Sequence, residues 1–82
     1  MAEGMNIIDG YIASDIDTGS ANTGYYGYVG PTQCWYINQQ STSGNITTLR
    51  YFAGSGLANY QDAWTKRAGL AYDYYSNIFM NY

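Results

Sequence analysis

The sequence offers few groups for covalent or acid–base chemistry. It contains no histidine, a single cysteine (Cys34) and a single lysine (Lys66). Without histidine, a Ser or Cys nucleophile needs a lysine or a carboxylate as its base. We expect Lys66 on the exposed last turn of a helix, and Cys34 begins a strand beside Trp35, where a small buried hydrophobe is the better interpretation. The sequence therefore predicts no catalytic residue and no enzymatic activity.

Metal ligands are also sparse. Asp15 and Asp17 form a D-x-D pair followed by Gly19, whereas an EF-hand loop needs its Gly one position later and a distal Glu. A solvated acidic turn is the interpretation we favour, with a weak surface Ca²⁺ site as the alternative. One cysteine excludes both an intrachain disulfide and a zinc site. We predict no metal and no cofactor.

Two further motifs have structural explanations. The glycines at 24, 27 and 30 lack the spacing of a phosphate-binding loop, and no helix is expected after them. Glycine within a strand more often marks a bulge or close packing by an aromatic ring. The glycosylation sequon at 45–47 has no signal peptide before it, so we expect it to be a turn that leads into a strand.

Aromatic side chains dominate the apolar composition. The 82 residues include eleven Tyr, two Trp and two Phe, against seven Ile, three Leu and one Val. Tyr and Trp combine an apolar body with a polar tip, which suits interfaces. A domain of this size is expected to be marginally stable alone. Since a disulfide and a metal are excluded, oligomerisation or docking onto a larger body is the remaining source of stability.

Charge and hydropathy exclude other classes of partner. The net charge is −3, and Arg50, Lys66 and Arg67 are the only cations, too few to neutralise a phosphate backbone. No apolar run approaches the 18 residues of a membrane span. The start MAEGMN has neither a basic n-region nor an apolar h-region. We therefore predict no nucleic acid and no membrane as partner, and synthesis in the cytoplasm.

The pattern of apolar runs and turn-forming residues predicts a mainly β fold with one short helix. We expect one small domain, residues 1–82, built on an antiparallel β-meander of about four to five strands. Aromatic and β-branched runs separated by turn-type sequences predict three strands within 25–53, at 25–29, 34–39 and 46–53. Both connections, 30–33 and 41–45, are short enough to join antiparallel neighbours.

The flanking segments are less regular. Residues 1–24 are expected to form an irregular N-terminal arm with a short strand around 7–13, followed by a loop over 15–24.

On the other side of the meander, a short helix is predicted over 59–68, with Asn59 as its cap and Gly69 just past its end. The segment 70–79 is expected to hold a final strand at 70–75, and one long helix over 59–79 is the alternative.

Both faces of the predicted meander are aromatic. Alternation places Tyr26 and Tyr28 with Trp35 and Ile37, and places Tyr36 with Tyr25 and Val29 on the opposite side. A sheet with one wet face should alternate between apolar and polar residues. One face can cover the core of the domain, and we expect the other to need a second chain as its cover.

The residues predicted to form that interface are the aromatic ones in the meander and in the segments that follow it: Tyr25, Tyr26, Tyr28, Trp35, Tyr36, Tyr51, Trp64, Tyr72, Tyr74 and Tyr75. The alternative is a stacking platform for sugar rings, formed by Trp35, Tyr36 and neighbouring tyrosines, so a glycan is kept as a further candidate partner.

Three pieces in fixed order resemble a known family: SDID (14–17), YYGYVGPTQCWYI (25–37) with LRYFAGS (49–55), and AWTKRAGLAYDYYSNIF (63–79). They are similar to small proteins of undefined activity that are encoded in tailed-bacteriophage genomes, often near virion structural genes. Cys34 stands where that family usually has a small or polar residue, and Tyr75 where it usually has Phe.

The resemblance implies a virion component: a head decoration, a neck or tail piece, or a fibre module. We therefore expect a structural protein that works as a homo-oligomer or docked on other virion proteins, located in a virion or an extracellular assembly. The alternatives are a small carbohydrate-binding module and a subunit of a non-viral extracellular filament.

Overall fold

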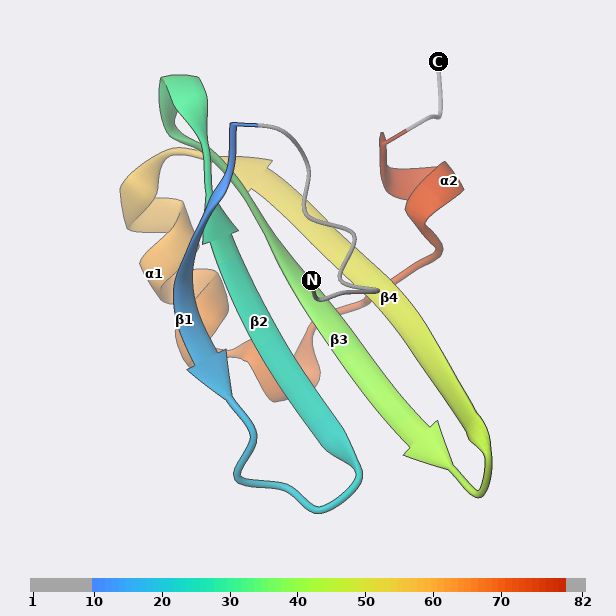
Figure 1. Ribbon diagram of the computed structural model, residues 1–82. Coiled ribbons are helices and arrows are strands. Elements are labelled where there is room, and N and C mark those ends of the chain that lie inside the picture. Colours follow the sequence, from blue (N-terminus) through green and yellow to red (C-terminus); the bar gives the residue numbers. More distant parts are fainter. Residues whose placement is uncertain (1–9, 80–82) are drawn as a thin grey trace.

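Four antiparallel strands form a single meander. The computed structural model describes residues 10–79, apart from the side chains of residues 76 and 79. The sheet order follows the chain, with the strands β1 (Ile12–Asp17), β2 (Thr23–Val29), β3 (Cys34–Ser43) and β4 (Ile46–Ser55) (Figure 1). The predicted fold, a small, mainly β domain with an antiparallel meander, is confirmed.

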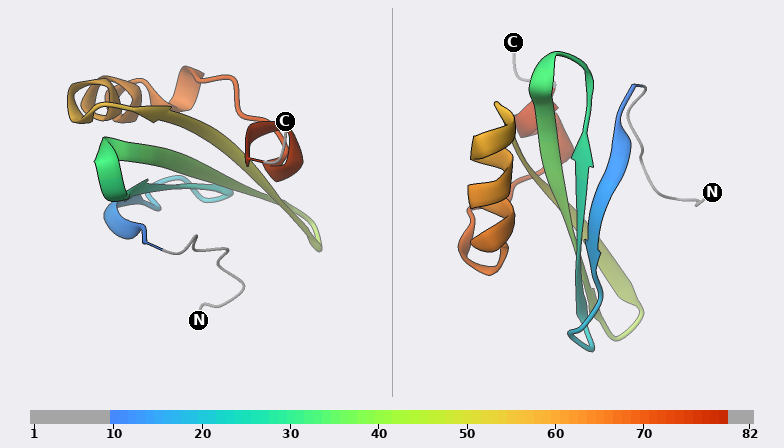
Figure 2. Two further views of the ribbon diagram at one scale, coloured as in Figure 1. Left: turned by 90° about the horizontal axis from the view of Figure 1, so that it is seen from above. Right: turned by 90° about the vertical axis from the view of Figure 1, so that its left-hand side faces the viewer.

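Helical segments complete the fold. Helix α1 (Leu57–Thr65) follows β4 and lies along one face of the sheet (Figure 2). A second, short helix, α2 (Tyr75–Phe79), lies beside β4. Single 3-10 turns occur at Pro31–Gln33 and Arg67–Gly69. We call the face covered by α1 the helix face and the opposite one the second face.

The predicted helix at 59–68 exists, but its boundaries and its cap differ. Gly56, with φ of 89°, precedes the first turn, and this left-handed conformation turns the chain from β4 into α1. Asn59 lies inside the helix, and its side-chain amide donates to the Ser55 carbonyl oxygen at 2.9 Å. The helix ends at Thr65, so Gly69 closes the following 3-10 turn instead of ending α1.

The strand predicted at 70–75 is wrong, as is the long-helix alternative over 59–79. Within 70–79, the described chain makes one bridge to β4, in which Tyr51 and Asp73 exchange backbone hydrogen bonds of 2.7 and 2.9 Å. The Asp73 carboxylate then accepts from the Tyr74 amide at 2.7 Å and from the Asn77 side chain at 3.1 Å. These local bonds favour a turn into α2 over continued pairing.

The loop predicted at 15–24 begins later than expected, because β1 continues to Asp17. Both aspartates of the D-x-D pair therefore lie on a strand. The strand expected around 7–13 falls partly outside the described residues, and the described strand begins at Ile12. Hydrogen bonds from other elements to the two aspartates, given below, explain why this polar sequence is extended.

The register assigns the aromatic residues to faces differently from the prediction. Val29 pairs with Trp35, so odd-numbered residues of β2 lie beside odd-numbered residues of β3. Tyr26 and Tyr28 therefore share the second face with Tyr36, whereas alternation had placed them with Trp35. The 3-10 turn between the two strands sets this parity.

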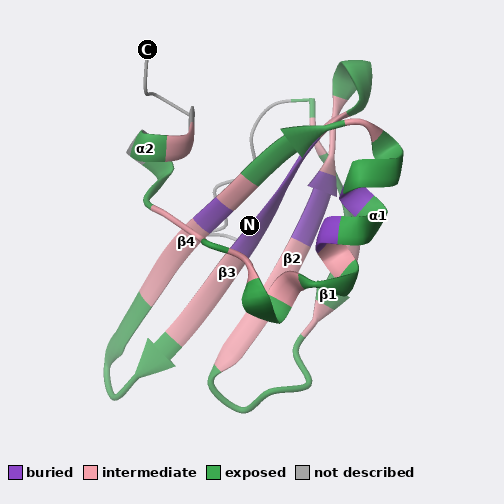
Figure 3. Ribbon diagram, turned by 180° about the vertical axis from the view of Figure 1, so that it is seen from behind, coloured by how far each residue is buried: buried purple, intermediate pink, exposed green. Residues whose placement is uncertain are grey.

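Both faces are aromatic, as predicted, but the second one is already covered at its centre. On the helix face, Trp35 and Ile37 pack with Tyr60 and Ala63 of α1. On the second face Tyr28, Tyr36 and Tyr51 form a cluster in which they are 4, 0 and 2% exposed. These rings shield one another, with Tyr28 stacked on Tyr36 at 4.7 Å between centroids, and Ile78 of α2 packs against them. These three rings therefore do not depend on a second chain for their burial, and a second chain on this face stays a prediction. Figure 3 shows the burial from the helix side.

Candidate functional site: the cleft between β1 and α1

Helix α1 reaches across β2 to contact the edge strand. The Tyr60 ring lies directly over Gly27 of β2, where any side chain would collide with its hydroxyl group. Because Gly27 has no side chain, the Tyr60 hydroxyl can reach over β2 and donate to Asp15 Oδ2 on β1 at 2.6 Å. The prediction that a strand glycine marks close packing by an aromatic ring is confirmed at Gly27.

Asp15 binds neutral donors. Besides the Tyr60 hydroxyl it accepts a hydrogen bond from the hydroxyl of the adjacent Ser14, at 3.0 Å. Burial, and then the hydrogen bond to Asp15, raise the pKa of Tyr60 well above its ordinary value. Tyr60 therefore remains a proton donor to Asp15 at neutral pH.

Asp17 is held by a cation. Arg67 donates through Nε and Nη2 to Asp17 Oδ2, both at 2.9 Å, and its guanidinium group lies 4.6 Å from the centre of the Trp64 ring. The pKa of Asp17 is lowered, first by a hydrogen bond from the Gly19 amide and then by Arg67. The D-x-D pair is therefore not a solvated turn, because both carboxylates face α1 and the turn after it. Among residues 10–79 no group of three or more potential metal ligands occurs.

A cleft of about 550 Å³ opens between β1 and α1. It lies within the size range of ligand-binding pockets. Asp15 is the one charged residue among those that line it, which are Ser14, Asp15, Val29, Leu57, Tyr60, Gln61, Trp64 and Thr65. Leu57, at the start of α1, is 45% exposed. The cleft can accept an apolar chain that ends in a positive or hydrogen-donating group.

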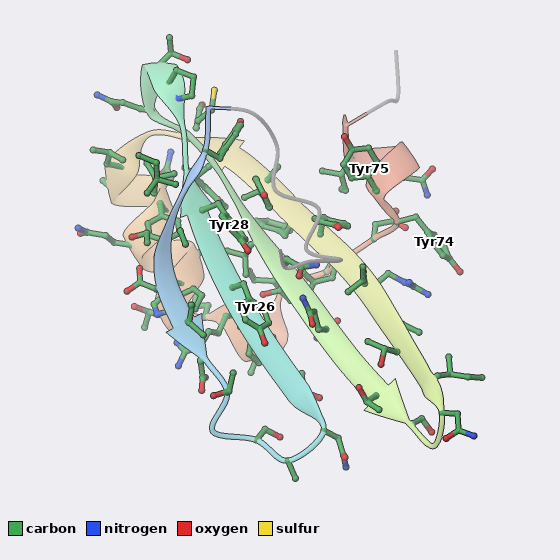
Figure 4. All side chains as sticks on the ribbon, in the orientation of Figure 1. Tyr26, Tyr28, Tyr74 and Tyr75 are labelled. Carbon is green, nitrogen blue, oxygen red and sulfur yellow. The ribbon has the colours of Figure 1, made fainter. Side chains whose placement is uncertain are left out.

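The ten predicted interface residues divide by burial. Tyr28, Trp35, Tyr36 and Tyr51 are buried in the domain's own core, beneath neighbouring side chains on the two faces of the sheet. Tyr74 and Tyr75, at 56 and 37% exposure, are accessible beside β4 (Figure 4). The other four, Tyr25, Tyr26, Trp64 and Tyr72, are half-buried. Contact of any of the ten with a partner remains a prediction.

The sugar platform predicted at Trp35 and Tyr36 does not exist. These side chains point to opposite faces of β3 and are 3 and 0% exposed. Consecutive residues of a strand cannot present their rings on one surface.

Other single residues have local roles. Cys34 is half-buried, not fully buried, and its sulfur lies 3.4 Å from the Thr32 hydroxyl. Lys66 is exposed, as predicted, and pairs with Asp62 at 3.2 Å. Asn45 lies in the two-residue turn between β3 and β4, which confirms the structural interpretation of the sequon.

The cleft itself was not predicted, and Leu57, Tyr60 and Gln61 were not among the candidate residues. One signal was present in the sequence. Asp15 and Asp17, two residues apart, lie on the same face if they belong to a strand, and Tyr60 and Trp64 lie on the same side of a helix. The pairing of strand and helix, however, spans 45 residues of sequence.

No protein-family model, curated protein or solved structure matches the chain. Among residues 10–79, no helix has the length and apolar character needed to cross a membrane.

Proposed function

We propose that this chain is a non-enzymatic structural subunit that joins a larger protein assembly through the open edge of its sheet. The observation that supports this proposal is the state of β1. Within residues 10–79 this strand pairs only with β2, and its Ile12 and Ile16 side chains are 75 and 62% exposed. These are the highest exposures among the large apolar side chains described, apart from that of Ile46.

Edge strands are usually protected from association by lysine, proline, β-bulges, inward-pointing charges or a covering loop. The inward-pointing charges of β1, Asp15 and Asp17, are bound by Tyr60 and Arg67. The β1 sequence IASDID has neither lysine nor proline. A bulge at Ser14 interrupts its pairing with β2, but a segment remains on each side of the bulge. Such an edge favours addition of a strand from another chain, in which main-chain hydrogen bonds provide affinity.

The family resemblance indicates which kind of assembly to propose. It supports a virion component, either a head decoration, a neck or tail piece, or a fibre module. The low content of charged residues, 11%, is consistent with a surface that is covered in an assembly.

Association tests this proposal. Light scattering on the purified protein, and co-sedimentation with phage particles from the encoding genome, should detect self-association or particle binding. The double variant Ile12→Thr/Ile16→Thr should weaken self-association or particle binding, whichever is observed, by at least about tenfold. The reason is that it removes exposed apolar area and keeps β-propensity.

Ile46→Thr is the matched control, since Ile46 is 68% exposed but begins β4, at the far side of the sheet. It should associate as the wild type does. A well-folded wild-type monomer that neither self-associates nor binds particles would refute the proposal.

A further inference from the structure

Asp15 is distinguished from its two neighbouring carboxylates by its partners. Asp17 pairs with Arg67 at 2.9 Å, and Asp62 pairs with Lys66 at 3.2 Å. Asp15, within the described part of the chain, contacts only the hydroxyl groups of Tyr60 and Ser14. A half-buried carboxylate that lines the cleft thus has no cation as a partner among residues 10–79.

We infer that the open edge of β1 receives an extended segment of a different protein chain, one that places a Lys or Arg side chain in the cleft beside Asp15. The inference rests on the proposed function, because it names the partner that the sheet edge would take. Charge complementarity supports it, since the described residues that line the cleft carry one negative charge and no positive one.

The geometry suits such a segment. Alternate side chains of an added strand lie about 6.8 Å apart on each face. Those on the helix face would enter the region between β1 and α1, where Asp15 and the exposed Leu57 line the cleft. Cross-strand neighbours share a face, and Ile12 pairs with Val29 whereas Ile16 pairs with Tyr26. The two isoleucines therefore point to opposite faces, and one added strand covers both.

A second copy of this chain is a poor occupant of the same edge. Each copy has a net charge of −3, and pairing β1 with β1 would bring two sets of Asp15 and Asp17 together. Like charges across strands are destabilising. Of the three cations, Arg67 and Lys66 are already paired, and Arg50 lies on β4 with its guanidinium 4.0 Å from the centre of the Tyr74 ring. The complementary charge must come from another protein.

Selection from a display library of random ten-residue peptides, with the intact protein as bait, tests the inference and does not require the natural partner. Enriched peptides should alternate β-branched and polar residues around a Lys or Arg. Titration of a synthetic copy of an enriched peptide into ¹⁵N-labelled protein should shift the amide signals of residues 12–17 and of α1. N-methylation of the peptide amides that face β1 should abolish binding, whereas N-methylation of the outward amides should leave it unchanged.

The charge contact is tested on both sides. Asp15→Asn keeps an oxygen acceptor for the Tyr60 hydroxyl and should weaken binding at least about fivefold. Asp62→Asn, the same change at an exposed position on α1, should leave binding within about twofold. Replacing the peptide Lys by Gln should weaken its binding to the wild-type protein but not to Asp15→Asn. The comparison isolates the interaction free energy between Asp15 and the peptide Lys.

Several results would overturn the inference: no enrichment, binding that Asp15→Asn does not change, or shifts confined to other elements. Self-association of the wild type through β1 would also overturn it while supporting the proposed function. The particle assay, conversely, can fail while the peptide result stands, so the two failures are distinguishable.

Discussion

At the scale of single residues, docking of α1 depends on one missing side chain and one phenol. Gly27 leaves the space through which Tyr60 reaches Asp15, and Trp64 also packs within 3.1 Å of the position that a Cβ atom would occupy. The bond from Tyr60 to Asp15 then ties the edge strand to the helix at 2.6 Å. Both features concern the same small volume beneath α1.

Gly27→Ala should therefore lower the free energy of unfolding by about 1–3 kcal/mol, as is usual when an atom is forced into packed space. Urea unfolding monitored by fluorescence measures the change. Gly69→Ala is the control, because no atom lies within 4 Å of the added carbon, and it should stay within about 0.5 kcal/mol of the wild type. Equal effects of the two substitutions would contradict the packing described at Gly27.

Alkaline pH should destabilise the fold through the phenols of Tyr60, which is buried, and Tyr72, which is half-buried. Burial is the main cause that raises the pKa of Tyr60 and Tyr72 well above the ordinary 10.0. The unfolded chain then loses these protons at lower pH than the folded chain. The stability that they contribute is complete below about pH 10 and is lost as the pH rises toward the folded-state values.

The thermal midpoint should accordingly be flat from about pH 7 to 9 and should fall above about pH 10. Tyr60→Phe and Tyr72→Phe should each make that fall less steep. Tyr74→Phe, at a position that is 56% exposed, should leave it unchanged. A fall of the same steepness in all three variants would contradict the assignment to Tyr60 and Tyr72.

At the scale of elements, the chain after α1 contacts the sheet mainly through side chains, because its described residues make one backbone bridge to β4. Tyr51 and Asp73 form this bridge, and Tyr75 packs its ring edge-on against Tyr51 at 5.5 Å between centroids. The helix α2 starts where the Asp73 carboxylate accepts from the Tyr74 amide and the Asn77 side chain. The Asp73 side chain therefore fixes the start of α2, in addition to the packing of Tyr75 and Ile78 on the sheet.

Asp73→Ala should loosen α2 and leave the sheet intact. The expected loss of stability is about 0.5–1 kcal/mol, typical of losing hydrogen bonds at an exposed position. Hydrogen exchange should become faster for amides within 75–79 and stay unchanged in β3. Asp73→Asn retains an acceptor oxygen and should restore most of the protection, and equal exchange in both variants would argue against this role.

The sequence predicted the three central strands well because their aromatic and β-branched runs end at turn-forming residues. It did not predict the pairing of faces, since that depends on the backbone of the turn at Pro31–Gln33, where Thr32 and Gln33 adopt φ of 57° and 62°. Local composition also misassigned Asp15–Asp17 as a loop. Their extended conformation is stabilised by Tyr60 and Arg67, which are 45 and 50 residues away.

At the scale of the whole molecule, two aromatic clusters share one strand. Trp35 and Ile37 point into the cluster on the helix face, and Tyr36, between them, points into the cluster on the second face. Displacement of β3 would disrupt the packing of both clusters. The domain is therefore expected to unfold as one unit, even though its core lies on both sides of the sheet.

The distribution of chromophores allows a direct measurement of this coupling. Both tryptophans, Trp35 and Trp64, belong to the helix face, whereas Tyr28, Tyr36 and Tyr51 dominate the second face. Tryptophan fluorescence and the NMR signals of the three tyrosine rings should give the same urea midpoint and the same slope. Because Tyr36 is fully buried, Tyr36→Leu should lower both midpoints together. A tyrosine transition that precedes the tryptophan one would instead mean that the second face melts independently of the face that α1 covers.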